Sequence, residues 1–139
     1  MTFVLDTNVV SELRKSDRVA NASVRAWARA RRPSELYLSA VTVTELEVGI
    51  GRVERRDGTQ GKRLRMWLED DLLDVFAGRI LPFDLATARR AAQLHVPDPR
   101  PERDAMIAAT AAEHGMTVVT RNVKDFATMG VPLIDPWTD

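Results

Sequence analysis

The stretch PERDAMIAATAAEHGMTVVTRNVKDF, residues 101–126, decides the fold of this chain. Pro101 suits the first position of a helix, because a helix start leaves that N–H group unpaired anyway. Gly115 suits the position just after a helix, where the backbone often turns left-handed. Residues 116–120 are then a short β-branched run typical of a buried strand. The stretch therefore predicts a helix, a turn, a strand, a second turn and the start of a second helix.

The same stretch places a carboxylate at each end of this unit. Asp104 lies in the first turn of the predicted helix, and three small or apolar residues share its face: Ile107, Ala108 and Ala111. Such a face suits close packing against a sheet. Asp125 lies just beyond the predicted strand. The helix start and the strand end are therefore expected to bring two acids to one edge of a sheet.

Short apolar strands and amphipathic helices alternate along the rest of the chain. Strands are expected at 2–5, 36–39, 80–83 and 131–134, and helices at 9–15, 22–32, 42–56, 63–77 and 85–96. Asp57-Gly58 and Gly61 are expected to break the chain between the third and fourth of these helices. The alternation predicts an α/β fold with a mainly parallel sheet and helices on both faces. Without a repeat or a long linker, residues 1–139 are expected to form a single domain.

Two of the expected helices carry apolar stripes that predict which side faces the core. A helical spacing of three and four residues groups apolar positions on one face. The stripe at 63–77 comprises Leu64, Leu68, Leu72 and Val75, and the stripe at 85–96 comprises Leu85, Ala88 and Ala92.

Composition excludes several kinds of site. The chain has no cysteine, so it has no disulfide, thiolate zinc site or cysteine nucleophile, and His95 and His114 are its only imidazoles. No apolar run approaches the roughly 20 residues that span a bilayer, and no basic region followed by an apolar segment opens the chain. A cytoplasmic protein without a membrane partner is the expectation.

Charge is balanced overall but clustered along the chain. The formal net charge is +0, yet residues 14–32 hold seven basic side chains against one acid, and residues 52–65 hold six against two. Such clusters suit a polyanion or an acidic partner, although a solvated helix face would have the same composition.

Four carboxylates lie at ends of predicted elements. Asp6 follows the first strand, Glu45 opens the third helix, and Asp104 and Asp125 belong to the stretch described first. Ligands of parallel α/β sheets bind at the carboxyl ends of the strands. Each acid also has a purely structural explanation: a turn or cap at Asp6, a capping box with Thr42 at Glu45, a helix dipole at Asp104, and a cap pair with Asn122 at Asp125.

Taken together, the four acids favour a metal site. Crowded carboxylates repel one another, and burying one without compensation shifts its pKa. A hard divalent cation such as Mg²⁺ or Mn²⁺ removes that conflict, because it prefers oxygen ligands. Such a site suits phosphodiester hydrolysis by a water that the metal activates.

Three blocks of the chain resemble the signature blocks of PIN-domain proteins, especially the FitB-like branch of the VapC toxin ribonucleases. They are MTFVLDTNVVSEL (1–13), SAVTVTELEVGIGR (39–52) and RDAMIAATAAEHGMTVVTRNVKDF (103–126). The resemblance runs over residues 2–135. It implies a three-layer α/β/α sandwich around a short, mainly parallel sheet.

The resemblance also implies an activity and a set of site residues. It implies a Mg²⁺- or Mn²⁺-dependent endoribonuclease cutting tRNA or rRNA, with in-line attack that leaves a 5′-phosphate and a 3′-hydroxyl. By motif position, Asp6 and Asp104 are the main metal ligands, Glu45 assists, and Asp125 completes a second site or holds a ligand water. Three polar residues match supporting positions: Asn8, Thr120 and Asn122. Asn122 and Asp125 compete for the fourth position.

The same resemblance implies partners. It implies a VapB-type antitoxin that restrains the toxin, a homodimer in which residues 42–56 and 63–77 take part, and contact with operator DNA only through the antitoxin. Arg103, a bulky base directly before Asp104, departs from the family pattern. It would contact a phosphate, pair with a nearby acid, or point to solvent.

Two other classes of function compete with the nuclease. One is a catalytically weak PIN-like module that regulates transcription together with its antitoxin, and the presence of all four acids argues against it. The other is an aspartate-nucleophile phosphatase built on Asp6. Such enzymes need a second acid two residues further on, where this chain has Asn8.

Overall fold

A computed structural model of the chain describes residues 1–138 and contains one five-stranded parallel sheet. The strand order is β3-β2-β1-β4-β5, so β1 and β4, far apart in the chain, lie side by side at the centre. The strands are β1 Phe3–Leu5, β2 Leu36–Ser39, β3 Ile80–Leu81, β4 Thr117–Val119 and β5 Leu133–Ile134. The prediction of a mainly parallel sheet is confirmed.

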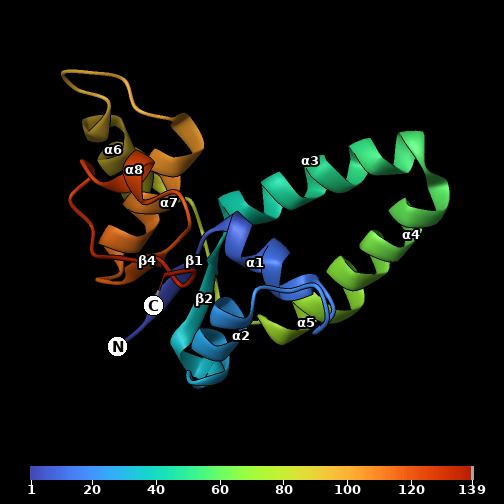
Figure 1. The fold of residues 1–139 in the computed structure, drawn as a ribbon. Coiled ribbons are helices and arrows are strands. Elements are labelled where there is room, and N and C mark those ends of the chain that lie inside the picture. Colours follow the sequence, from blue (N-terminus) through green and yellow to red (C-terminus); the bar gives the residue numbers. More distant parts are fainter. Residues whose placement is uncertain (139) are drawn as a thin grey trace.

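Helices cover both faces of this sheet (Figure 1). They are α1 Thr7–Arg14, α2 Ala22–Arg29, α3 Ala40–Arg56, α4 Gly58–Met66, α5 Leu73–Val75, α6 Leu85–Leu94, α7 Glu102–Glu113 and α8 Val123–Phe126. Short helical turns η1 Pro33–Glu35 and η2 Trp67–Leu72 complete the set. The helix starts and ends differ from the predicted ones mostly by one to three residues, as is usual for fraying termini. None of the helices within residues 1–138 combines the length and apolar character that a membrane span needs.

Alternate strand residues supply two separate cores. Phe3 and Leu5 of β1 pack with α1, α2, α3 and η2, whereas Val4 between them packs with α7 and α8. Val118 and Val119 of β4 divide in the same way. This is the period-two alternation of a strand that is buried on both faces. The three-layer α/β/α architecture is therefore confirmed.

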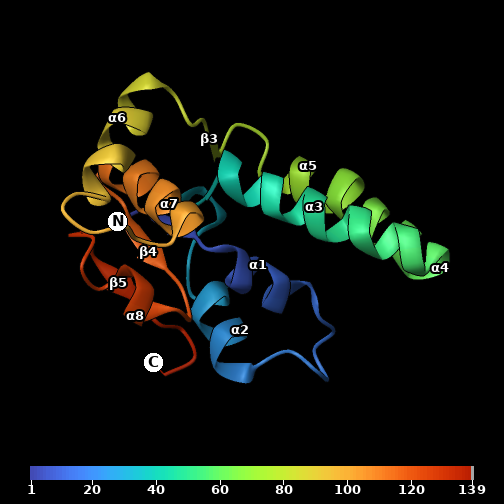
Figure 2. The same ribbon diagram turned by 90° about the horizontal axis from the view of Figure 1, so that it is seen from above.

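Helices α3 and α4 form a long hairpin that projects away from the sheet (Figures 1 and 2). The predicted break at Gly61 is wrong, because α4 begins at Gly58 and runs through it. Gly61 is buried against α3, and a Cβ atom there would lie 2.6 Å from Glu54 Cα. The missing side chain serves close helix packing, a use of glycine that its chain-breaking tendency conceals.

The predicted stripe along α4 and the helical turns after it is correct for three of its four positions. Leu68 and Leu72 are buried and Leu64 is partly buried, but Val75 is 60% exposed and Phe76 takes its place in the core. The segment Trp67–Leu72 is π-helical. A π turn holds an extra residue, so it rotates everything that follows relative to the α-helical spacing.

The predicted inward face of α6 is wrong. Leu85 is 75% exposed, whereas Thr87 and Ala91 are buried. Asp84 caps the helix by accepting hydrogen bonds from the Thr87 amide at 3.0 Å and from the Thr87 hydroxyl at 2.8 Å. A buried hydroxyl needs such a partner. The cap therefore lets a polar residue face inward, which an apolar-stripe prediction does not anticipate.

Candidate active site

Asp6 and Thr120 are the centre of the candidate site. They follow β1 and β4, whose last residues Leu5 and Val119 lie directly opposite each other. The Thr120 hydroxyl donates to Asp6 Oδ2 at 2.7 Å, and the Thr7 amide donates to Oδ1 at 2.7 Å. Asp6 and Thr120 are both buried. The expected cap role of Asp6 is real, but it leaves the carboxylate oxygens at the sheet edge where the other acids gather.

Burial and neighbouring charges oppose ionisation of Asp6. Burial raises the pKa of its carboxyl, and the hydrogen bonds from Thr120 and Thr7 act in the opposite direction. The charges of Glu45 and Asp125 raise the pKa of Asp6 further. These two acids, from distant parts of the chain, therefore lie within electrostatic reach of Asp6.

The expected supporting residues form a network around Thr120. Asn8 Nδ2 lies 3.5 Å from the Thr120 hydroxyl oxygen, and Asn8 Oδ1 accepts from the Arg121 amide at 3.4 Å. The Asn122 amide donates to the Thr120 hydroxyl at 2.9 Å. Asn122 thus contributes through its backbone, while Asn8 contributes through its side chain.

Glu45 reaches the site from α3, and its expected capping box is wrong. Helix α3 begins at Ala40, and Ser39 caps it by accepting from the Val41 amide at 3.0 Å. Glu45 therefore lies in the second turn, too far along to bond the cap. Its Oε1 accepts from the Thr7 hydroxyl at 2.7 Å instead. This register excludes the capping box as the explanation of Glu45.

Asp104 has a strongly raised pKa. It lies in the first turn of α7 and is partly buried. Burial, followed by the charges of Asp6, Asp125 and Glu45, raises its pKa to about 6. A helix start alone would favour its charged form and lower that pKa. The pKa of Asp104 is raised instead, by burial and by the charges of the other three acids, so the helix dipole does not explain this residue.

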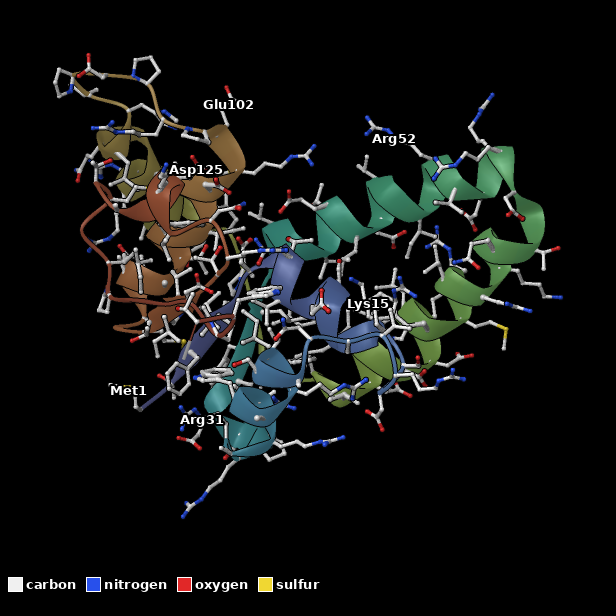
Figure 3. All side chains as sticks on the ribbon, in the orientation of Figure 1. Met1, Lys15, Arg31, Arg52, Glu102 and Asp125 are labelled. Carbon is white, nitrogen blue, oxygen red and sulfur yellow. The ribbon has the colours of Figure 1, made fainter. Side chains whose placement is uncertain are left out.

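Asp125 is the most exposed of the four acids. It lies on the short helix α8, on the same side of the molecule as the start of α7, where Glu102 marks the first turn (Figure 3). The cap-pair explanation is wrong, because Asn122 makes no side-chain cap hydrogen bond and only its carbonyl meets the Asp125 amide, at 3.0 Å. The charge of Asp125 acts on both Asp6 and Asp104.

The four carboxylates converge without forming a finished ligand shell. Within residues 1–138, no three acidic or histidine side chains are already close enough together to hold an ion. The oxygens of Glu45 are engaged by Thr7 and, at 3.7 Å, by Arg103 Nη1. The donor set is nevertheless all oxygen, the ligand type that Mg²⁺ and Mn²⁺ prefer. The chemistry of these residues therefore fits a hard divalent cation.

Sequence reasoning missed Thr7 and placed Thr42 at a helix cap, where it does not lie. The Thr7 hydroxyl holds Glu45 and also lies 3.1 Å from the Thr42 hydroxyl oxygen. Thr7 lies between Asp6 and Asn8, which were both predicted to belong to the site. This position is the one feature of the sequence that could have indicated Thr7. Thr42 is fully buried inside α3 rather than at its cap.

Some of the basic side chains in the two clusters, residues 14–32 and 52–65, make contacts within the protein. Arg25 pairs with Asp17 at 3.1 Å and donates to the Lys15 carbonyl, while Arg31 lies over the rings of Phe3 and Trp27. Arg52 is exposed and points away from α3 into solvent (Figure 3). The far end of the α3–α4 hairpin therefore presents free cationic surface, whereas part of the 14–32 cluster is used internally.

Comparison with known proteins agrees with this geometry. A model of the PIN domain matches residues 3–131. The chain belongs to the PIN-domain family. This PIN-domain chain is 40% identical to VapC ribonuclease Y4jK of Sinorhizobium fredii, over 97% of each chain. It is 38% identical to Toxin FitB of Neisseria gonorrhoeae, over 99% of each chain.

A solved relative shares the whole fold of this PIN domain. The structure of FitAB bound to an IR36 DNA fragment contains a chain that is 36% identical. The TM-score is 0.88, over 98% of this chain and 96% of that one. The resemblance to the VapC and FitB branch is therefore confirmed across nearly the full length.

Proposed function

We propose that this PIN-domain chain is the toxin component of a toxin–antitoxin pair and cleaves RNA as a Mg²⁺- or Mn²⁺-dependent endoribonuclease. The observation that carries the proposal is the gathering of four acids at the carboxyl edge of β1 and β4: the charges of Glu45 and Asp125 act on both Asp6 and Asp104, and the charge of Asp6 acts on Asp104. Similarity to a VapC ribonuclease and to Toxin FitB supports it. The chain would act as one domain in the cytoplasm, where its RNA substrate lies.

The acids have separate roles in this proposal. Asp6 and Asp104 would hold the ion, with Asp6 kept in one orientation by Thr120 and Thr7. Glu45, positioned by the Thr7 hydroxyl, would assist directly or through water. Asp125, the exposed acid, would complete a second metal site or orient a ligand water. Asn8 and the Asn122 amide would keep Thr120 in place.

A bound divalent ion supplies a more acidic water and neutralises charge that develops on the phosphate. The protein supplies position, because its four acids come from four different elements joined to a rigid sheet. The raised pKa of Asp104 leaves a proton on part of the population near neutral pH. Ion binding would release that proton, so the affinity for the ion would rise with pH.

Partners follow from the same similarity. The solved FitAB relative is an assembly bound to DNA. We therefore include in the proposal a small VapB-type antitoxin, a homodimer that associates with it, and contact with operator DNA through the antitoxin alone. Exposed basic residues on the α3–α4 hairpin offer surface for the antitoxin or for RNA.

Purified protein tests the catalytic assignment. Cleavage of single-stranded RNA should need Mg²⁺ or Mn²⁺, and Asp104→Asn should lose it by at least a hundredfold while its circular dichroism is unchanged. Asp98→Asn, an exposed acid in the connector before α7, is the matched control and should keep full activity. Equal cleavage by wild type and Asp104→Asn would sink the assignment.

Expression in cells tests the toxin role. Wild-type protein alone should arrest growth, and co-expression of the small antitoxin encoded beside it should relieve the arrest. Asp104→Asn should be harmless. Harmless expression of a protein that cleaves RNA in vitro would contradict the toxin role and leave the nuclease assignment standing.

A further inference from the structure

A hollow beside the acids has no assigned role. It measures about 350 Å³ and is lined by Ala40, Val41, Thr44, Phe83, Glu102, Arg103 and Met106. It lies between the first turns of α3 and α7, the two helices that carry Glu45 and Asp104. Arg103 lines the hollow and also reaches Glu45, so the hollow adjoins the candidate active site.

The walls of this hollow are apolar, and its rim is polar. Phe83 and Met106 are partly buried and pack on the core of α7 and β4 with part of their surfaces. Thr44 is exposed, and its hydroxyl makes only a long contact of 3.4 Å to the Ala40 carbonyl. An aromatic and thioether wall beside a hydroxyl suits a flat, hydrogen-bonding ring better than an aliphatic side chain.

Arg103 stands at the border between the hollow and the carboxylates. Its Nη1 lies 3.7 Å from Glu45 Oε2, and half of its side chain is exposed. A cation in this position complements a phosphate that enters beside the acids. A strand with its phosphate at the acids and one neighbouring base in the hollow would therefore satisfy both surfaces at once.

We propose that the hollow is a nucleoside subsite, in which Phe83 and Met106 contact one base of the RNA next to the scissile phosphate and Arg103 binds a phosphate at its rim. The subsite rests on the proposed ribonuclease function. Thr44 reads the edge of the base. Phe83 adds affinity for any base, because every base has a π-face.

The base contact is tested by abasic substitution. The probe is a short single-stranded RNA that wild type cuts once, together with copies in which each nucleotide near the cut is abasic in turn. Phe83→Leu keeps apolar volume and loses the ring, so it should raise KM about tenfold with kcat little changed. On the RNA that is abasic at the subsite position, wild type and Phe83→Leu should have the same KM. Tyr37→Ala, a partly buried aromatic packed on the same core, is the control and should leave KM unchanged.

Substitutions at Arg103 and Thr44 should change different quantities: the salt dependence of KM for Arg103 and the base preference for Thr44. Arg103→Ala should weaken all sequences alike and reduce the slope of log KM against log salt by about 0.7, the value for one phosphate contact on a single strand. Arg89→Ala on α6 should leave the slope unchanged. Thr44→Val should alter base preference at one position of a random RNA pool and at no other.

RNA binding separates failure of the subsite from failure of the nuclease. In the Asp104→Asn background, Phe83→Leu should weaken binding of a labelled single-stranded RNA of random sequence about tenfold by fluorescence anisotropy. If wild type cuts no RNA but this loss of binding is seen, the nuclease proposal fails and base binding in the hollow stands. Unchanged KM and unchanged binding in Phe83→Leu overturn the subsite. A dimer that becomes monomeric in Phe83→Leu, seen by light scattering, also overturns it, because the hollow is then an interface between copies.

Discussion

Among single residues, Asp6 is held by one group that is distant in the chain and by one that is adjacent to it. The Thr120 hydroxyl, 114 residues away, and the adjacent Thr7 amide each donate to one of its oxygens. Charge-assisted hydrogen bonds of this kind fix an orientation as well as lower an energy. Asp104, by contrast, is dominated by burial and repulsion. Asp6 is therefore fixed by hydrogen bonds, whereas the charged form of Asp104 is disfavoured and a bound cation would stabilise it.

Removing the charge of Asp104 should stabilise the protein in the absence of divalent ions. The folded-state pKa of Asp104 is about 6 against an ordinary aspartate value of 3.8, so the folded state binds the proton more tightly. The stability of wild type is therefore greatest below pH 4 with respect to this group and falls as the pH rises to about 6. Above pH 6, Asp104→Asn should gain about 1–2 kcal/mol, allowing for solvent screening. Urea unfolding of wild type and Asp104→Asn at pH 5 and 7.5 in EDTA measures this change in the free energy of unfolding. A lower free energy of unfolding for Asp104→Asn at pH 7.5 would contradict the unfavourable environment of the Asp104 charge.

Replacing Thr120 should weaken the metal site without removing a ligand. Thr120→Val deletes the donor to Asp6 Oδ2 while keeping the shape of the side chain. Loss of such a supporting partner typically lowers metal affinity 10–100-fold, so the Mg²⁺ concentration for half-maximal cleavage should rise by that factor. Thr110→Val makes the same change at a fully buried threonine of α7 whose hydroxyl bonds the Met106 carbonyl, and should leave the Mg²⁺ dependence unchanged.

At the scale of elements, the α3–α4 hairpin depends on one close approach. Gly61 lets the two helices touch at Glu54, and Arg65 crosses the same junction to pair with Glu54 at 3.0 Å and with Glu47. The ion pairs are partly exposed, so they contribute little by themselves. The glycine contact decides how closely the helices approach.

Two glycine substitutions in this hairpin should have opposite effects. Gly61→Ala would place Cβ 2.6 Å from Glu54 Cα and should lower the free energy of unfolding by about 1–3 kcal/mol through overpacking. Gly49→Ala lies within α3, where a Cβ meets nothing within 4 Å, and should raise it by about 0.5–1 kcal/mol. Chemical denaturation of both variants measures the difference. Equal effects would show that the close approach does not limit the packing.

At the scale of the whole molecule, the order of strands creates the site. Because β1 and β4 are neighbours, chain segments at residues 6 and 120 meet, and α3 and α7 then bring Glu45 and Asp104 to the same edge. Each acid comes from a different element, so the four acids come together only in the folded protein. Neutralising their repulsion therefore stabilises the packing of all these elements. An ion that binds only this assembled edge should therefore stabilise the entire molecule.

Mn²⁺ should raise the melting temperature. A ligand present at about 100 times its Kd adds about 2.7 kcal/mol to the folded state, which is roughly 10 °C for a domain of this size. Differential scanning calorimetry with and without Mn²⁺ measures the shift. Asp6→Asn and Asp104→Asn should each lose most of it, whereas Asp98→Asn should keep it. A shift that survives both site variants would place the ion elsewhere.

Local pattern was enough to predict the strands, most helices and the four acids at element ends, because propensity, periodicity and capping residues act over a few neighbours. It was not enough for the inward face of α6, the register after the π-helical segment Trp67–Leu72, or the partner of Glu45. Those depend on contacts between distant segments: Thr7 and Glu45 are 38 residues apart, and Asp6 and Thr120 are 114 apart. The residues alone indicate which chemical groups are available and roughly where along the elements they lie. Which of these groups meet is set by strand order and helix packing, because both bring together partners that no local rule can rank.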